Sequence, residues 1–216
     1  MPYTDFTLER VEADFGLVTN PVPLYADVPA VPVPPWLAET LIRGRRSAAM
    51  ISEKARSEFL VAPILTAVRE LTDDPLTIFS GQRLDVDPTL GLVGECDYIL
   101  ALTPPVPRLK APLLTIMEAK RGDIEVGLGQ CAAQMVGARL FNDRAGATGR
   151  PILGCVTTGD DWQFLRLEGD ELLLDLRRYY LSDLAQILGI FREVIAQASG
   201  PRGIVPATGG PGLPGR

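Results

Sequence analysis

Hydrophobic positions recur along the chain with two different periods, and these periods predict a succession of helices and strands. A helical spacing of apolar residues is expected over 36–45, 47–71, 124–142 and 182–198. Short apolar or alternating runs bounded by turn residues predict strands over 76–81, 83–87, 91–103 and 112–120, and three more within 150–181. This mixed order favours an α/β (α+β) fold with a mixed central sheet flanked by helices.

The helix expected over 47–71 carries a carboxylate in an unusual place. Its apolar face consists of Ile51, Ala55, Ala62 and Leu65. Glu58 falls on that same face, where a charged side chain needs a partner. Pro63 cannot donate a hydrogen bond to the carbonyl of Phe59, so a kink is expected there.

The two ends of the chain differ in composition from the middle. Residues 1–36 include the proline-rich stretch NPVPLYADVPAVPVPPW, and we expect an extended arm that wraps over the domain without forming core. Residues 200–216 are rich in glycine and proline and poor in apolar anchors, which predicts a flexible tail. Between them, 37–199 is expected to form one domain, long enough to bury a core of its own.

Composition excludes several classes of function. Histidine is absent from the 216 residues, which excludes Ser-His-Asp and Cys-His nucleophilic schemes and imidazole zinc sites. Any catalysis must rest on carboxylates, lysine, arginine, hydroxyls and hard metal ions. The net charge of −6 argues against a protein that coats nucleic acid non-specifically. No apolar run approaches the roughly 18–20 residues of a membrane span, so a cytoplasmic location without membrane contact is expected.

Cysteines and glycines give no cofactor motif. Cys96, Cys131 and Cys155 lack the spacing of a zinc site or a disulfide framework, so we interpret them as small buried hydrophobic residues. The stretches TTGDD and VGLGQ fall short of a phosphate-binding loop and of a dinucleotide-binding motif. No nucleotide cofactor is therefore expected.

The stretch LLTIMEAKRGD (113–123) brings charge to the end of an apolar strand. Residues two apart on a strand point to the same face, so Glu118 and Lys120 are expected to be neighbours. On its own such a pair is typical of a salt bridge at the edge of a sheet. If the preceding strand pairs with this one, Asp97 of GECDYIL comes alongside Glu118, which opens a second interpretation.

That second interpretation is a metal site. Asp97, Glu118 and the carbonyl of Ala119 would converge on one point, and carboxylates and carbonyls are ligands that Mg²⁺ or Mn²⁺ prefers. Gln130 and Gln134 lie four apart on the next helix and share a face. They could reach a substrate phosphate or fix Glu118 and Lys120, or they could be ordinary helix-packing amides.

With these residues in order, the sequence resembles the PD-(D/E)XK nuclease superfamily over roughly 47–198. It is most similar to the N-terminal nuclease domains of type I restriction subunits and to small stand-alone bacterial members, also in the words EAKRGD, GQCAAQM and CVTTGDDWQFLRLE. The resemblance implies a restriction endonuclease-like αβββαβ core. It implies that Asp97 and Glu118 bind metal, that Lys120 is catalytic, and that Glu58, Gln130 and Gln134 assist. Cys96 stands where the motif has proline.

Two hypotheses follow. The first is a Mg²⁺- or Mn²⁺-dependent phosphodiester hydrolase that acts as a DNA endonuclease, in which Glu58 binds or positions a second metal ion or water. Arg43, Arg45 and Arg46 would then bind the DNA backbone, and a homodimer would help to grip both strands. The second is a catalytically silent protein of the same fold that serves as a nucleic-acid or protein interaction module.

Overall fold

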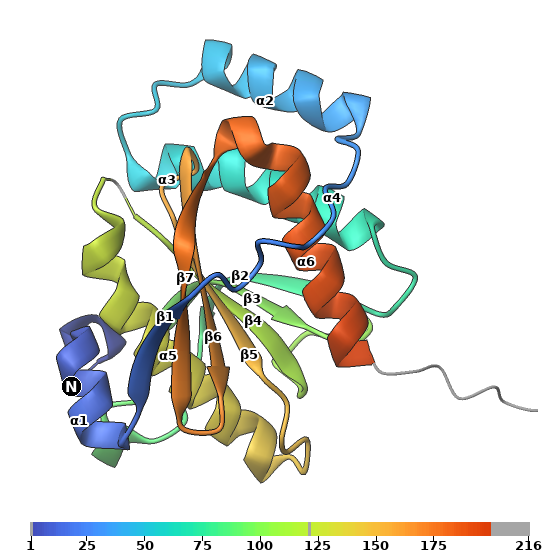
Figure 1. The fold of residues 1–216 in the computed structure, drawn as a ribbon. Coiled ribbons are helices and arrows are strands. Elements are labelled where there is room, and N and C mark those ends of the chain that lie inside the picture. Colours follow the sequence, from blue (N-terminus) through green and yellow to red (C-terminus); the bar gives the residue numbers. More distant parts are fainter. Residues whose placement is uncertain (1, 121, 200–216) are drawn as a thin grey trace, which may run out of the picture.

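The computed structural model describes residues 2–120 and 122–199, and it places seven strands in one mixed sheet between two layers of helices (Figure 1). The strands are β1 Val18–Val22, β2 Thr77–Arg83, β3 Glu95–Ala101, β4 Leu113–Ala119, β5 Ile152–Thr157, β6 Asp161–Glu168 and β7 Glu171–Tyr180. The helices are α1 Leu8–Phe15, α2 Pro35–Ser47, α3 Glu53–Arg56, α4 Ala62–Glu70, α5 Ile124–Arg144 and α6 Leu184–Ser199. The expected mixed sheet flanked by helices is confirmed.

The order of strands across the sheet is β1-β7-β6-β5-β4-β3-β2. The pairs β1·β7 and β4·β5 are parallel, and the other four pairs are antiparallel. The parallel pair β4·β5 requires a crossover connection, which α5 provides. The carboxyl ends of β4 and β5 and the amino end of α5 therefore meet at one end of the sheet.

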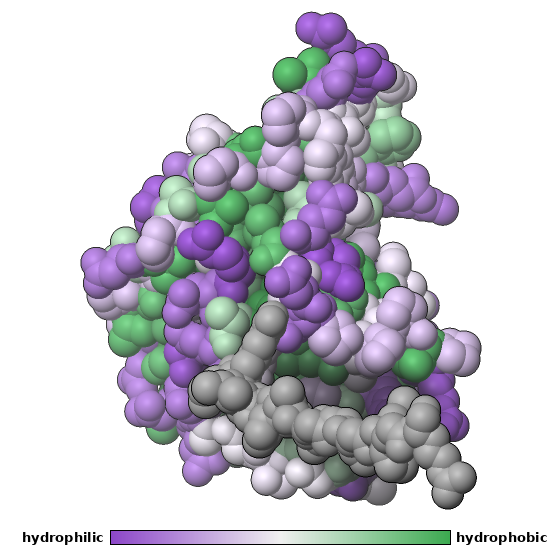
Figure 2. Space-filling view, turned by 90° about the vertical axis from the view of Figure 1, so that its right-hand side faces the viewer, coloured by the Kyte–Doolittle hydropathy of each residue, from purple (hydrophilic) through white to green (hydrophobic). Residues whose placement is uncertain are grey.

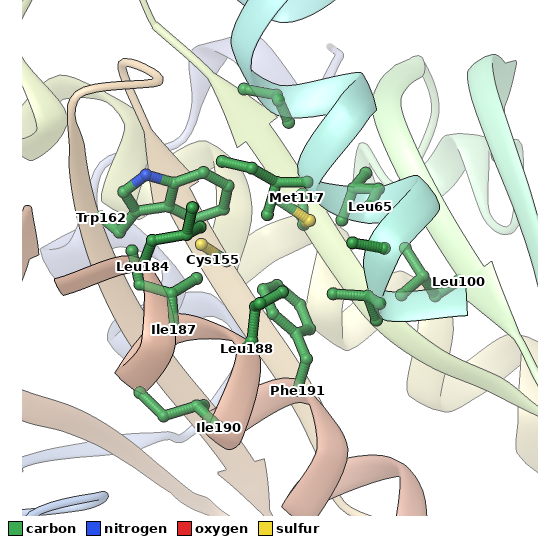
Figure 3. Close-up of a cluster of buried hydrophobic side chains, with 14 of the residues drawn as sticks. Leu65, Leu100, Met117, Cys155, Trp162, Leu184, Ile187, Leu188, Ile190 and Phe191 are labelled. Carbon is green, nitrogen blue, oxygen red and sulfur yellow. The ribbon is translucent and has the colours of Figure 1, made fainter. Parts of the chain in front are cut away.

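Each face of the sheet has its own hydrophobic core. One face packs against α5, whose residues Leu128, Cys131 and Met135 are buried among side chains of the strands. The other face packs against α4 and α6, and Figure 3 shows Met117, Cys155 and Trp162 beside Leu188 and Phe191 of α6. The three cysteines are free and buried, as predicted.

The prediction for the N-terminal arm is wrong in one respect. The stretch from 23 to 34 does run without helix or strand over the domain, but the arm also forms core. Tyr3, Phe6 and Val11 are buried in the α5-side core, and Tyr25 and Val31 in the α6-side core. The arm also supplies α1 and the edge strand β1, which tolerates a proline, Pro21, because an edge strand has unpaired donors on one side.

The helix expected over 47–71 is interrupted. It begins only at Glu53, and a π-helical turn, η2 Ser57–Val61, joins α3 to α4 just before Pro63. The carbonyl of Phe59, which Pro63 cannot bond, lies against α2, where a Cβ added to Gly44 would approach that oxygen to 3.0 Å. Pro63 therefore interrupts the regular α-helix, and the wider π-helical turn precedes it.

Two further details complete the fold. Residues 83–87 are not a separate strand: β2 ends at Arg83, and Asp87 forms a single isolated bridge with Leu92. The tail expected over 200–216 lies outside the described residues. In the part of the chain that the structure describes, no helix has both the length and the apolar character that crossing a membrane requires.

Candidate functional site

Asp97 and Glu118 lie side by side, as the sequence predicted. The antiparallel register pairs Tyr98 with Met117, so the next residue pair along the ladder is Asp97 and Glu118. The backbone N–H of Ala119 donates to Asp97 Oδ2 over 2.7 Å, which fixes the carboxylate at the end of β4. Because the N–H and C=O of one strand residue point to the same side, the Ala119 carbonyl is directed toward Asp97 as well.

Lys120 and the two glutamines of α5 complete the cluster. Lys120 Nζ lies 2.7 Å from Glu118 Oε1 and 3.0 Å from Gln130 Oε1. Gln134 Nε2 donates to the other carboxylate oxygen of Glu118 over 3.0 Å and to the carbonyl of Glu95 over 3.3 Å. Both oxygens of Glu118 are therefore held, and only 4% of this residue is exposed. The glutamines fix Glu118 and Lys120, which was one of the two roles expected for them.

Sequence reasoning missed a glycine that makes room for this arrangement. A Cβ at Gly127 of α5 would lie 2.6 Å from a methyl carbon of Val156 and 3.1 Å from two carbons of the Lys120 side chain. The Lys120 side chain thus packs against the backbone of α5 at Gly127 and reaches Glu118 from there. Gly127 belongs to the VGLGQ stretch, and a glycine inside a helical pattern is a signal of close packing.

Burial disfavours the charged form of both carboxylates, although Lys120 lies beside them. The pKa of Glu118 is raised to about 7, mainly by burial and also by the neighbouring Asp97, while Lys120 opposes both effects. Burial also raises the pKa of Asp97, against the bond from the Ala119 N–H. Burial and the charge of Asp97 both disfavour the ionised form of Glu118, so an additional positive ion beside the two carboxylates would be stabilising.

This donor set fits one kind of metal better than others. Among residues 2–120 and 122–199, no group of three or more His, Cys, Asp or Glu side chains is placed to hold a metal ion. A structural zinc site needs four such ligands. Mg²⁺ keeps several waters and needs only one or two carboxylates from the protein. Asp97 and Glu118 match that smaller requirement.

Glu58 is a correction to the predicted site. Its side chain is 56% exposed, and its ion-pair partner is Lys54, with 3.8 Å between Nζ and the carboxylate. The apolar face that made it unusual does not exist as expected, because Ile51 precedes the helix and is 74% exposed. The π-helical turn also changes the phase of the residues that follow. Within the described chain, Glu58 is not part of the group around Glu118.

The three arginines proposed for DNA binding lie in the second half of α2, at the end of the sheet where β4 and β5 finish (Figure 1). Arg45 pairs with Asp160 in the turn between β5 and β6, and this turn directly follows Thr157, the partner of Ala119. Arg43 pairs with Glu39 of the same helix, and Arg46 is exposed.

Arg56, which the sequence did not single out, also contacts that turn. Its guanidinium lies 2.6 Å from Asp160 Oδ2 and donates to the Thr158 carbonyl. Arg45 and Arg56 thus share one carboxylate beside the candidate site.

Comparison with known proteins gives no relative: no protein-family model matches the chain, and no curated protein or solved structure is significantly similar to it.

Proposed function

We propose that this protein is a metal-dependent phosphodiester hydrolase with DNA as its substrate. The observation that carries the proposal is the meeting of Asp97, Glu118 and Lys120 near the beginning of β3 and the end of β4, with both Glu118 oxygens held by hydrogen bonds. An edge salt bridge would be exposed and would need neither a second carboxylate nor buried amides. Here Gln134 is fully buried and Glu118 nearly so.

The order of elements supports the same proposal. The run α4-β2-β3-β4-α5-β5 has the αβββαβ order of a restriction endonuclease-like core, and the three residues fall where the resemblance to the PD-(D/E)XK superfamily expects them. We propose this core as the finer description of the fold.

The roles of the residues follow from their chemistry. Asp97, Glu118 and the Ala119 carbonyl would hold Mg²⁺ or Mn²⁺. A bound divalent ion would lower the pKa of a water molecule and offset charge on the phosphate. Lys120 carries three N–H donors, of which Glu118 and Gln130 take two. Among the described residues no acceptor takes the third, which could donate to the attacking water or to a phosphate oxygen.

Hydrolysis would follow an in-line course. The water oxygen forms a bond to phosphorus while the bond to the leaving oxygen on the opposite side breaks, and Lys120 offsets the negative charge that develops. Gln130 and Gln134 act as positioning residues, since they hold Lys120 and Glu118 and need not touch the substrate. Arg43, Arg45 and Arg46 would contact backbone phosphates from α2.

Cleavage of plasmid and single-stranded DNA tests the proposal. We expect cleavage by the wild type with Mg²⁺ or Mn²⁺, none with EDTA, and a loss of about 100-fold or more for Lys120→Ala. Lys110→Ala is the matched control, because Lys110 is exposed and lies outside the cluster. If the folded wild type and Lys120→Ala leave every DNA substrate equally intact, the nuclease hypothesis is wrong. The protein is then better described as a catalytically silent interaction module.

A further inference from the structure

A cavity lies at the opposite end of the sheet from Glu118. Its volume is about 460 Å³, within the range of small-molecule sites. Leu114 and Leu153, near the beginning of β4 and β5, line it, whereas the candidate catalytic residues lie where those strands end. The last turns of α6 and the loop 148–151 complete its walls. This cavity is separate from the proposed nuclease site.

Two buried polar atoms of this cavity's lining residues have no hydrogen-bond partner in the described structure. They are the hydroxyl of Tyr25 and Nε of Arg166. Tyr25 is only 5% exposed, and its ring packs edge-on against Phe164 with 5.8 Å between centroids, so the hydroxyl has little freedom to turn elsewhere. Leaving such groups unpaired costs about 1–3 kcal/mol each. A partner that accepts hydrogen bonds from both would remove that cost.

The charge of the cavity identifies the kind of partner. Two arginines, Arg150 and Arg166, line it, and its described lining contains no acidic residue, although the whole chain carries a net charge of −6. Arg150 donates one N–H to the carbonyl of Ala198, and Arg166 Nη2 lies 2.9 Å from Glu168. A guanidinium has five N–H donors in a fork that suits carboxylate or phosphate, so donors remain on both.

Figure 2 views the side of the molecule that carries α6, where hydrophobic residues appear in small areas between hydrophilic ones. The cavity likewise combines apolar and charged residues. An apolar wall lies beside the two arginines and is formed by Leu114, Leu153, Pro151 and Val194. We propose that this cavity binds a small organic anion, a carboxylate or phosphate group on a compact apolar body. Arg150 and Arg166 bind the oxyanion, the Tyr25 hydroxyl, which is buried in this structure, joins them when the ligand binds, and the apolar wall contacts the body.

Calorimetry in the presence of EDTA tests the site. It measures the binding of three probes, which are phenyl phosphate, benzoate and inorganic phosphate. We expect at least one organic anion to bind more tightly than inorganic phosphate at equal ionic strength. Arg166→Gln should weaken this binding by about tenfold or more, since a charged hydrogen-bond partner is lost. Arg192→Gln is the control, because Arg192 of α6 is exposed and does not line the cavity.

Tyr25→Phe separates a ligand site from a cavity that holds only water. It removes one unpaired hydroxyl, so the fold should be at least as stable, while affinity for the organic anion should fall several-fold. Unchanged affinity in Tyr25→Phe and Arg166→Gln, or no binding to the wild type, would overturn the proposal. Binding should persist in Lys120→Ala, so this test can fail or succeed independently of the nuclease proposal.

Discussion

Replacing Glu118 by Gln should shift the relative stability of the metal-free protein in favour of the variant as pH rises. The pKa of Glu118 rises from its ordinary 4.5 to about 7 on folding, mainly because the group is buried. The folded state therefore binds this proton more tightly than the unfolded state does. Stability from Glu118 is fully present below pH 4.5 and is lost as pH rises through about 7. At about 1.36 kcal/mol for each pKa unit, the loss amounts to at most about 3 kcal/mol.

Urea unfolding in EDTA at pH 5 and pH 8, followed by tryptophan fluorescence, measures this effect. From pH 5 to pH 8, the unfolding free energy of Glu118→Gln should increase relative to that of the wild type, by up to about 3 kcal/mol. Glu58→Gln, which changes an exposed carboxylate, should show no such movement. Adding Mg²⁺ at pH 8 should stabilise the wild type and not Glu118→Gln. Parallel pH profiles for wild type and Glu118→Gln would refute this account of the buried carboxylate.

Two further predictions test how the site and the fold are held. Gly127→Ala should lower DNA cleavage by roughly tenfold or more while the protein stays folded, because the added methyl would lie 2.6 Å from Val156 and 3.1 Å from Lys120, so that both side chains must shift; circular dichroism and the cleavage assay check the two halves. Asn142→Ala should reduce the free energy of unfolding by about 2–4 kcal/mol in urea titration, because the buried amide bonds both the N–H and the carbonyl of Leu113 at 2.7 and 2.8 Å; an unchanged midpoint would contradict this.

The centre of the candidate site was predictable because its geometry is local. β3 and β4 are joined by a turn-rich connection, residues 102–112, so antiparallel pairing was the expected outcome, and the register then brings Asp97 to Glu118. The side-chain period of a strand placed Lys120 beside Glu118. The helical spacing of Gln130 and Gln134 put both amides on one face, and α5 turns that face toward the sheet.

The predictions for Glu58 and for the N-terminal arm were wrong because of features that hydrophobic periodicity does not show. The reading of Glu58 assumed one regular helix, but a π-helical turn adds a residue to one turn, and each residue corresponds to about 100° around the axis. The prediction for the N-terminal arm was based on its prolines. The burial of the arm depends on residues that are distant from it in the sequence. Gly189 of α6, for example, lies so close to the arm that a Cβ there would be 2.2 Å from the carbonyl of Pro29.

The two edge strands bear on how this molecule can associate. β1 contains Pro21, which offers no N–H to a further strand, and β2 contains Gly81 with a φ of 60°, a conformation that departs from an extended strand. Both features discourage another chain from extending the sheet by backbone pairing. If two copies do associate on DNA, we expect contact through helices or loops, and the β-sheets of the two copies should remain separate.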